Sequence, residues 1–270
     1  MGTLVDAAGT VHERASGAVR IVSLVPSLTE LVCALGLAAL LVGRTGFCIH
    51  PRATLKSIPK LGGTKDVDLA KLQALAPTHV IVNVDENRRE DAAAIARLGS
   101  RVIVTHPCAP DDNPGLYRLL GGIFGREEAA EALSARYAAA RERALAGVVP
   151  AAERVLYLVW RAPWIGVSRE TYISRMLGLF GWDTLPAAAA DRYPEIDLAA
   201  LAGEADRVLL STEPYPFREA HRAEAAAICG RPAELIDGEM VSWYGSRAIA
   251  GLAYLADFTG RAARRRGIAS

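Results

Sequence analysis

The stretch REEAAEALSARYAAARERALAG, residues 126–147, predicts one long helix near the middle of the chain. Alanine, leucine and arginine are strong helix formers, and the only helix-breaking residue in the stretch is the glycine at its end. Its apolar positions form one narrow stripe, namely Ala130, Leu133, Tyr137, Ala140 and Ala144. At about 1.5 Å per residue the helix would span roughly 30 Å. It could be an ordinary surface helix or a connection between two domains, and the flanking sequence decides between them.

Strands and helices alternate on both sides of this stretch. The apolar runs RIVSLV (20–25), HVIVNV (79–84) and RVIVT (101–105) are typical of buried parallel strands. Further strands are expected at 40–43, 154–159, 207–211 and 233–236. Helices are expected at 26–35, 68–76, 87–98, 114–124, 169–180, 198–203, 218–229 and 244–265. This alternation predicts βαβ units in mainly parallel sheets, the first with the strand order 2-1-3-4, and residues 1–18 should form a polar leader or an edge hairpin.

The two halves also resemble each other. DLAKLQALAPTHVIVNVDEN (68–87) aligns with DLAALAGEADRVLLSTEP (197–214) at an offset of about 129 residues, so that Asp68 matches Asp197. We therefore expect an α/β fold of two Rossmann-like lobes, 1–113 and 151–270, joined by connecting helices in 114–150. Ligands of open α/β sheets bind beyond the carboxyl ends of the strands, which predicts a site in the cleft between the lobes.

Composition excludes several classes of function. Of 270 residues 51% are hydrophobic, and 31 basic against 30 acidic residues leave a net charge of +1, which argues against nucleic-acid binding through a basic field. The first residues lack the basic start and apolar core of a secretory signal, and no segment is apolar enough for membrane insertion. The sequence as written is thus expected to be soluble and cytoplasmic, or periplasmic or extracellular if a leader has been removed. Its four cysteines contain no CxxC pair, so no disulfide framework is expected.

Several stretches resemble one family of transport proteins. They are RIVSLVPSLTELVCALG (20–36), LVG (41–43), GGTKDVDLAKLQALAPTHVIV (62–82), DLAALAGEADRVLL (197–210) and the WYGSR segment. With them the chain resembles, from Arg20 to Arg265, the ABC-transporter substrate-binding proteins of the helical-backbone metal receptor type, which bind cobalamin, haem and ferric siderophores. The resemblance implies a rigid interdomain helix with little hinge motion. It also implies a corrinoid, a tetrapyrrole such as haem, or a ferric chelate as ligand, no obligatory cofactor, and an ABC transporter permease as partner.

Two features depart from the secreted members of that family. The first is the missing signal. The second is that cobalamin-binding members carry docking glutamates for transporter arginines at positions that here fall on Ala70 and near Leu198 or Ala199. Losing two interface charges should weaken docking. The alternative hypothesis is a cytoplasmic enzyme or intracellular ligand-handling protein on the same scaffold. No catalytic residue is assigned, because the chain has no G-x-S-x-G elbow, P-loop or GxGxxG motif.

The residues that follow the expected strand ends are the candidate ligand contacts. In the first half they are Arg44, Phe47, Cys48, His50, Thr64, Lys65, Asp85, Glu86, Asn87 and Arg88. In the second half they are Trp160, Arg161, Trp164, Arg192, Tyr193, Glu213, Tyr215, Phe217, Glu239, Trp243 and Tyr244. Aromatic surfaces beside arginines suit a large planar or polyoxygenated ligand, through stacking and paired hydrogen bonds to carboxylate or phosphate. The alternative for Trp160 and Trp164 is that they cap the core of the second lobe.

Four further side chains are of the types that bind zinc: Cys48, His50, His106 and Cys108. In a 2-1-3-4 sheet the second and fourth strands would lie about 14 Å apart, so only the long loop at 44–64 could bring the two pairs together. We expect instead that His50 alone contacts the ligand and that Cys108 packs in the interior. His79 is expected to be structural, and His12 and His221 to be exposed.

Overall fold

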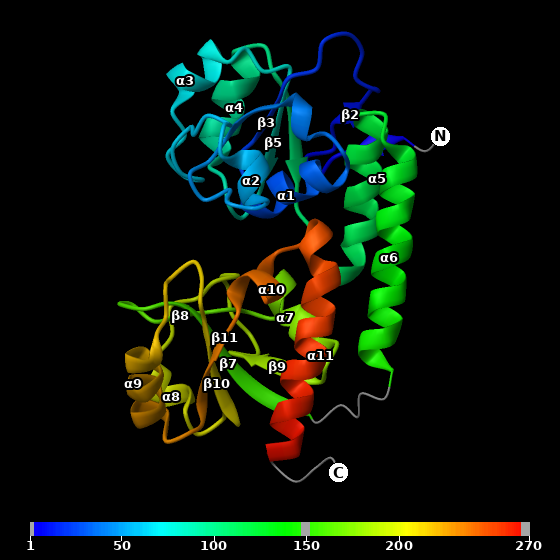
Figure 1. Ribbon diagram of the computed structural model, residues 1–270. Coiled ribbons are helices and arrows are strands. Elements are labelled where there is room, and N and C mark those ends of the chain that lie inside the picture. The colour runs from blue at the N-terminus through cyan, green and yellow to red at the C-terminus, as the bar shows by residue number, and fades with distance from the viewer. Residues whose placement is uncertain (1–2, 147–151, 266–270) are drawn as a thin grey trace. The chain divides into compact units, whose positions relative to one another are not determined.

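The computed structural model describes residues 3–146 and 152–265, and the chain forms two compact units (Figure 1). Unit 1 comprises Met1–Pro107, Asp111–Tyr137 and Tyr244–Arg247. Unit 2 comprises Cys108–Pro110, Ala138–Trp243 and Ala248–Ser270. Each unit is an α/β structure with a mainly parallel sheet, which confirms the fold class expected from the alternating strands and helices.

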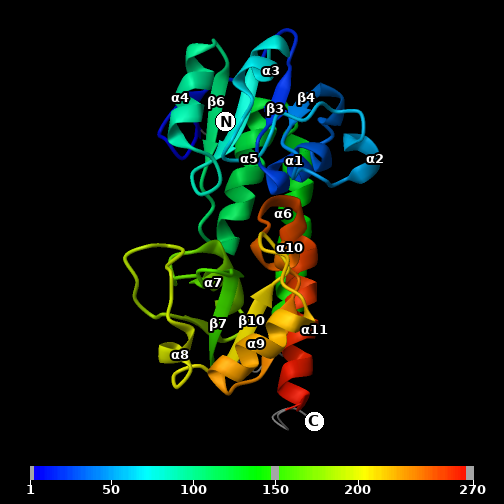
Figure 2. The same ribbon diagram turned by 90° about the vertical axis from the view of Figure 1, so that its left-hand side faces the viewer.

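The sheet of unit 1 has four parallel strands in the order β4-β3-β5-β6 (Figure 2). They are β3 (Ile21–Ser23), β4 (Leu41–Arg44), β5 (His79–Asn83) and β6 (Arg101–Thr105). In chain order this is 2-1-3-4, as predicted. Val22 pairs with Val80 and Val80 with Val102, so the apolar runs lie in register at the centre of the sheet. Leu24, Val82 and the helical residue Ile95 extend this buried core.

Helices and a short hairpin surround this sheet. The helices are α1 (Pro26–Ala34), α2 (Arg52–Leu55), α3 (Leu69–Ala74), α4 (Arg89–Arg97) and α5 (Asn113–Ile123). The hairpin, β1 (Leu4–Val5) and β2 (Val11–His12), covers the edge of β6, because Ala7 N donates to Val104 O and Val104 N donates to the Asp6 carboxylate. The predicted edge hairpin is confirmed. His12 is not exposed as expected but buried, with Nε2 3.0 Å from Asp6 Oδ2.

Unit 2 repeats the topology of unit 1. Its parallel strands are β7 (Glu153–Trp160), β9 (Trp182–Leu185), β10 (Arg207–Ser211) and β11 (Ala233–Ile236), in the order β9-β7-β10-β11. The short β8 (Ile165–Gly166) runs antiparallel to the end of β7. The sequence analysis did not predict β8 or β9. β8 has only two residues and β9 (WDTL) contains two polar ones, so neither forms an apolar run, and β9 is recognisable only because it pairs with β7.

The repeated Asp-Leu-Ala segment has the same local role in both units. Asp68 caps α3 by accepting from Lys71 N, and Asp197 caps α8 (Leu198–Leu201) by accepting from Ala199 N and Ala200 N. A carboxylate at this position satisfies backbone donors that the first helical turn leaves unpaired. The alignment of the two halves therefore reflects a shared helix start.

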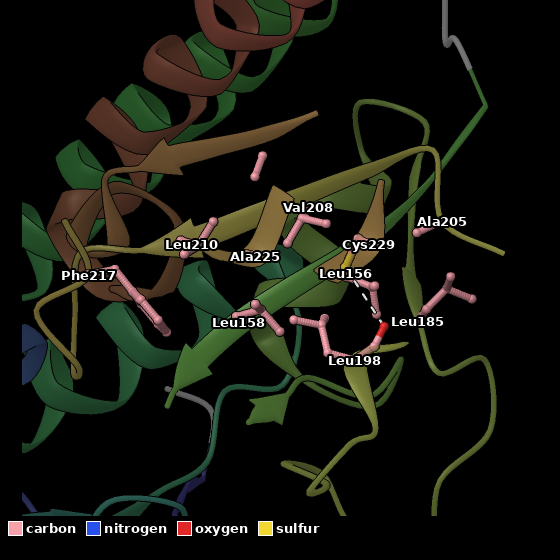
Figure 3. Close-up of a cluster of buried hydrophobic side chains, with 11 residues drawn as sticks. Leu156, Leu158, Leu185, Leu198, Ala205, Val208, Leu210, Phe217, Ala225 and Cys229 are labelled. Carbon is pink, nitrogen blue, oxygen red and sulfur yellow. Dashed lines mark hydrogen bonds between the residues drawn. The ribbon is translucent and has the colours of Figure 1, made fainter. Parts of the chain in front are cut away.

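Unit 2 has a core of its own, drawn in Figure 3. Leu156, Leu158, Val208 and Leu210 point from β7 and β10 into this cluster. Phe217 and residues from α8 and α9 (Glu219–Cys229) complete the cluster, and Cys229 Sγ lies 3.8 Å from Leu198 O. The cluster places the ends of β7 and β10 side by side, so the loops that follow these two strands lie close together.

The remaining helices are α6 (Glu127–Leu145), α7 (Tyr172–Gly178), α10 (Gly238–Ser242) and α11 (Ala248–Arg265). The five stripe residues predicted on α6 are all buried. The end expected for this helix at Gly147 lies outside the described residues. The helix predicted at 244–265 begins only at Ala248, because a 3-10 turn, Gly245–Arg247, precedes it. No described helix combines the length and hydropathy needed to cross a membrane.

Candidate functional site

Beyond the carboxyl ends of β3 and β4, the Cys48 thiol is buried among hydroxyl groups. Its Sγ receives a hydrogen bond from Thr29 Oγ1 at 3.0 Å and lies 3.1 Å from Thr45 Oγ1, and the side chain is completely buried. Burial raises the pKa of the Cys48 thiol, although the bonds from Thr29 and Thr45 lower it in part. A buried neutral thiol with hydroxyl neighbours holds the loop after β4 against α1. It is not a surface on which a ligand could rest.

Arg44 also serves the loop that it precedes. Its guanidinium donates to the carbonyls of Leu55, Thr45 and Cys48 at 2.9–3.1 Å, and the residue is 6% exposed. All of these acceptors are backbone oxygens of 45–55, so the arginine organises the loop from within. Four of the five N–H donors of Arg44 are thus used within this loop.

Asn87 joins three loops. Its Oδ1 accepts from Asn83 N at 2.9 Å, and its Nδ2 donates to Thr64 O at 2.8 Å and to Leu24 O at 3.3 Å. These bonds link the end of β5, the GGTK loop and the end of β3. These three bonds use most of the hydrogen-bonding capacity of an amide side chain. Asn87 thus holds these three loops together by hydrogen bonds to their backbone atoms.

The solvent side of these loops is formed by other residues. Phe47 is 64% exposed, and Ile49 and Val84 are exposed as well. Lys65 and Arg88 lie in the GGTK loop and at the start of α4, and both are exposed. His50 is half-buried. Unit 1 therefore exposes three apolar side chains and at least two cations in the loops that follow its strands.

The segment Tyr244–Arg247 returns from the C-terminal half and packs in unit 1. Tyr244 Oη donates to Glu86 Oε1 at 2.8 Å, and Gly245 bonds through its N to Asn113 and through its O to Tyr117. Arg247 Nε donates to Glu30 at 2.8 Å. A Cβ on Gly245 would contact Leu31, and its φ of 79° also favours glycine. Tyr244 and Glu86, two candidate contacts, are thus bonded to each other.

In unit 2 the loops after β7 and β10 form an aromatic cluster, which we define as Trp160, Trp164, Tyr215, Phe217 and His221. Trp160 packs edge-on against Tyr215 at 5.4 Å, and Trp164 stacks on Phe217 with an interplanar angle of 2°. His221 contacts both Tyr215 and Phe217, so the expectation that it is exposed was wrong. Trp164 does pack against the core, whereas Trp160 is 42% exposed.

Arg161 holds this cluster to α9. Its Nε and a terminal nitrogen donate to both oxygens of Glu224 at 2.8 Å, and its guanidinium lies 5.9 Å from the Trp164 ring centre. The bond to Glu224 raises the pKa of Arg161, and the same bond lowers the pKa of Glu224. Glu224 thus accepts from the two adjacent N–H donors of Arg161 that could otherwise bind a ligand carboxylate.

Glu213 follows the end of β10 and is held by two donors. Trp243 Nε1 and Ser242 Oγ both donate to its Oε1, at 2.7 and 2.8 Å. Burial raises the pKa of the Glu213 carboxyl and the nearby Glu239 and Asp237 raise it further, whereas the bonds from Ser242 and Trp243 lower it. A Cβ on Gly238 would lie 2.6 Å from Glu213 Cγ, so the backbone approaches this carboxylate closely.

The other candidates lie near these groups or at their margin. Tyr193 is exposed on the loop before α8, and Arg192 donates to the carbonyl of Glu170. Glu239 lies in the first turn of α10, and Trp243 directly follows that helix. Among the described residues no three His, Cys, Asp or Glu side chains are arranged to hold a metal ion. No group of this kind contains Cys48, His50, His106 or Cys108, and His106 Nε2 lies 3.4 Å from Asp85 Oδ1.

The sequence analysis missed some residues that shape this site. Glu224 is 63 positions from Arg161 along the chain, and an exposed-looking helical glutamate carries no signal of such a pairing. Ile49 and Val84 could have been found, because each is an apolar residue in an otherwise polar loop next to a candidate contact.

Comparisons with known proteins identify a family and a shared fold. A family profile described as periplasmic binding protein matches residues 21–220. The structure is similar to the periplasmic vitamin B12 binding protein BtuF of Vibrio cholerae, with a TM-score of 0.75 and 19% identity over 90% of this chain and 97% of that chain. It is similar to the periplasmic heme-binding protein RhuT from Roseiflexus sp. RS-1, with a TM-score of 0.76 and 23% identity over 89% and 97% of the two chains.

It is also similar to an ABC transporter substrate-binding protein from Listeria monocytogenes, with a TM-score of 0.72 and 16% identity over 89% and 98% of the chains. At these identities the solved structures establish a shared fold. No curated protein matches the chain in sequence.

Proposed function

The chain belongs to the family of periplasmic binding proteins, and from that premise we propose that it binds a corrinoid, a tetrapyrrole such as haem, or a ferric chelate. One observation carries the proposal. All the large aromatic side chains that are exposed among the described residues lie at the end of a strand (Trp160) or in a loop that follows one (Phe47 and Tyr193). Exposed aromatic rings offer flat apolar surface to a large planar ligand.

The hydrogen bonds within the loops separate the candidate residues into those that hold the loops in place and those that are available to a ligand. The polar atoms of Arg44, Cys48 and Asn87 form hydrogen bonds within unit 1. We propose that these residues hold the loops in place without contacting the ligand. The proposed contacts in unit 1 are Phe47, His50, Lys65 and Arg88. In unit 2 they are Trp160, Tyr193, Glu213, Tyr215 and Glu239.

We further propose that the protein works in the periplasm or outside the cell and delivers its ligand to an ABC transporter. The family description supports this location, whereas the cytoplasmic location expected from the first residues has no support in the comparisons. Ala70 and Ala199 are both exposed, so a transporter would meet no carboxylate at these two positions. Fractionation of cells that produce the natural protein tests the location, and recovery in the cytosol alone would contradict it.

The ligand class can be tested by titrating the purified protein with cyanocobalamin, haemin and ferric hydroxamate or catecholate chelates, followed by calorimetry. We expect at least one class to bind with a micromolar or lower Kd. Trp160→Ala should weaken that binding about tenfold, because it removes an exposed ring. Val11→Ala, which truncates an exposed side chain of the N-terminal hairpin, should not change it. The absence of binding by all these ligands would refute the proposal.

The same samples separate a binding protein from an enzyme on this scaffold. Native mass spectrometry of the freshly purified protein identifies any ligand that co-purifies, and incubation then shows whether the ligand is converted. We expect the ligand to be released unchanged. Turnover would favour the alternative of an enzyme or ligand-handling protein.

A further inference from the structure

Two arginines named as candidate contacts, Arg161 and Arg192, already donate hydrogen bonds within unit 2. Arg161 donates two parallel hydrogen bonds to Glu224, and Arg192 donates to the carbonyl of Glu170. The sequence analysis had expected such arginines to bind carboxylates of the ligand. Both side chains of this pair are more than a third exposed, so the pair contributes little to stability, but Glu224 occupies two donors of the Arg161 guanidinium. A ligand carboxylate at this place would have to compete with Glu224.

Glu213 differs from these residues, because its partners are neutral donors. Trp243 Nε1 and Ser242 Oγ share Oε1, and none of the described cationic side chains forms an ion pair with the carboxylate. No described residue donates to Oε2 either, which leaves this oxygen free to accept. Tyr157 Oη donates to Ser211 Oγ two residues earlier, so the strand end below Glu213 is fixed as well. The carboxylate is therefore a positioned acceptor that lacks a counter-ion.

Its surroundings determine which chemical groups it can accept. Tyr215, two positions on, belongs to the aromatic cluster, so a flat ligand resting there would bring its edge towards Glu213. A carboxylate on that edge would be repelled by Glu213 and by the nearby Asp237 and Glu239. A primary amide on the same edge would donate an N–H to the free oxygen, and hydrogen bonds to charged groups are the stronger ones.

We infer that Glu213 is a specificity-determining residue that selects a ring with primary amide side chains, a corrinoid, over a ring with carboxylate side chains such as haem. The inference rests on the proposed function and chooses among its ligand classes. It depends on the position of one acceptor and on the pairing of the neighbouring arginines.

The test uses two ligands with the same ring and metal. Dicyanocobyrinic acid heptaamide carries primary amides where dicyanocobyrinic acid carries carboxylates. We expect the wild-type protein to bind the heptaamide at least about tenfold more tightly than the acid, and cyanocobalamin more tightly than haemin. Glu213→Gln, which keeps the shape but removes the charge, should weaken heptaamide binding and strengthen binding of the acid, so that the ratio falls severalfold.

Two control variants accompany the test. Glu204→Gln removes an exposed charge near the amino end of β10 and should leave the ratio unchanged. Arg218→Gln removes an exposed cation at the start of α9 and should also leave it unchanged. The wild-type comparison needs no variant, so it stands even if Glu213→Gln does not fold.

The outcomes separate the inference from the proposed function. If the acid or haemin binds as well as the amide ligands or better, the inference is wrong and the proposed function survives. An unchanged ratio in a folded Glu213→Gln protein would likewise overturn it. If no macrocycle and no ferric chelate binds at all, the proposed function fails and the inference fails with it.

Discussion

Single polar side chains near the strand ends have two different roles in this protein. Asn87 and Arg44 direct their hydrogen bonds to backbone atoms of neighbouring loops, whereas Lys65 and Arg88 are exposed. In sequence all four looked alike, as polar residues after an apolar run. The difference arises from the partners that folding brings within about 3 Å, and a buried polar group requires such partners.

His79 provides a prediction at this scale. The residue is 4% exposed, packs edge-on against Phe124 and has no partner for Nε2. Burial, together with the nearby Arg101 and His12, lowers the pKa of His79 from 6.5 to about 4. The ring is therefore neutral in the folded protein, whereas the unfolded chain takes up a proton below about pH 6.5. Its contribution to stability is complete above that pH and is lost as the pH falls towards 4.

A pKa change of this size corresponds to roughly 3 kcal/mol at most. Urea unfolding of wild type and His79→Gln between about pH 7 and about pH 4 measures it. We expect the variant to lose less stability than wild type over this range. Parallel pH profiles would show that His79 does not titrate in the way its burial requires.

Among the elements, α5 shows how packing decides what a helix tolerates. Gly115 and Gly121 both lie in this helix. A Cβ on Gly121 would lie 2.6 Å from Ala130 Cβ and 3.0 Å from Arg126 O, whereas a Cβ on Gly115 would meet nothing within 4 Å. The close approach of α5 and α6 therefore requires glycine at one of these two positions only.

Alanine at the two positions should act in opposite directions. Gly121→Ala should lower the free energy of unfolding by about 1–3 kcal/mol, because the turn between the helices must shift to admit the methyl group. Gly115→Ala should raise it by about 0.5 kcal/mol, since alanine loses less conformational entropy in a helix. Urea unfolding of both variants measures the difference. A stabilising Gly121→Ala would mean that the two helices pack less closely than described.

The elements also show where sequence periodicity reaches its limit. The long stripe on α6 and the apolar runs of β3, β5, β6 and β10 were identified with nearly correct ends. β8 and β9, of two and four residues, were missed, and the C-terminal helix was begun four residues early. β8 is too short to form a pattern and β9 contains Asp183 and Thr184, so both strands are recognisable only through their pairing with β7.

For the whole molecule, the family and the fold class follow from the same observations. The resemblance found in the strand–proline–helix and Asp-Leu-Ala segments is confirmed by the family match and by the shared fold. The strand order of unit 1 recurs in unit 2, which supports the interpretation of two related halves.

The helix α6 leads to a prediction about mechanics. It is continuous over its 19 residues, with no glycine or proline inside it, and it runs from unit 1 into unit 2. A helix without such breaks bends little. We expect ligand binding to cause local loop changes and no wide hinge closure. Small-angle scattering of the free and ligand-saturated protein should give the same radius of gyration, and a clear contraction on binding would contradict this role of α6.

The amino-acid sequence was sufficient for most of the strands and helices, the repeat of the two halves and the family. These depend on the spacing of apolar residues and on short local motifs, which are written along the chain. Only the tertiary structure assigned a partner to each polar side chain. It buried Cys48 and Arg44, joined Arg161 to Glu224 and placed none of the described cations in an ion pair with Glu213. Such pairings depend on distances between residues far apart in sequence, and local periodicity contains no information about those distances.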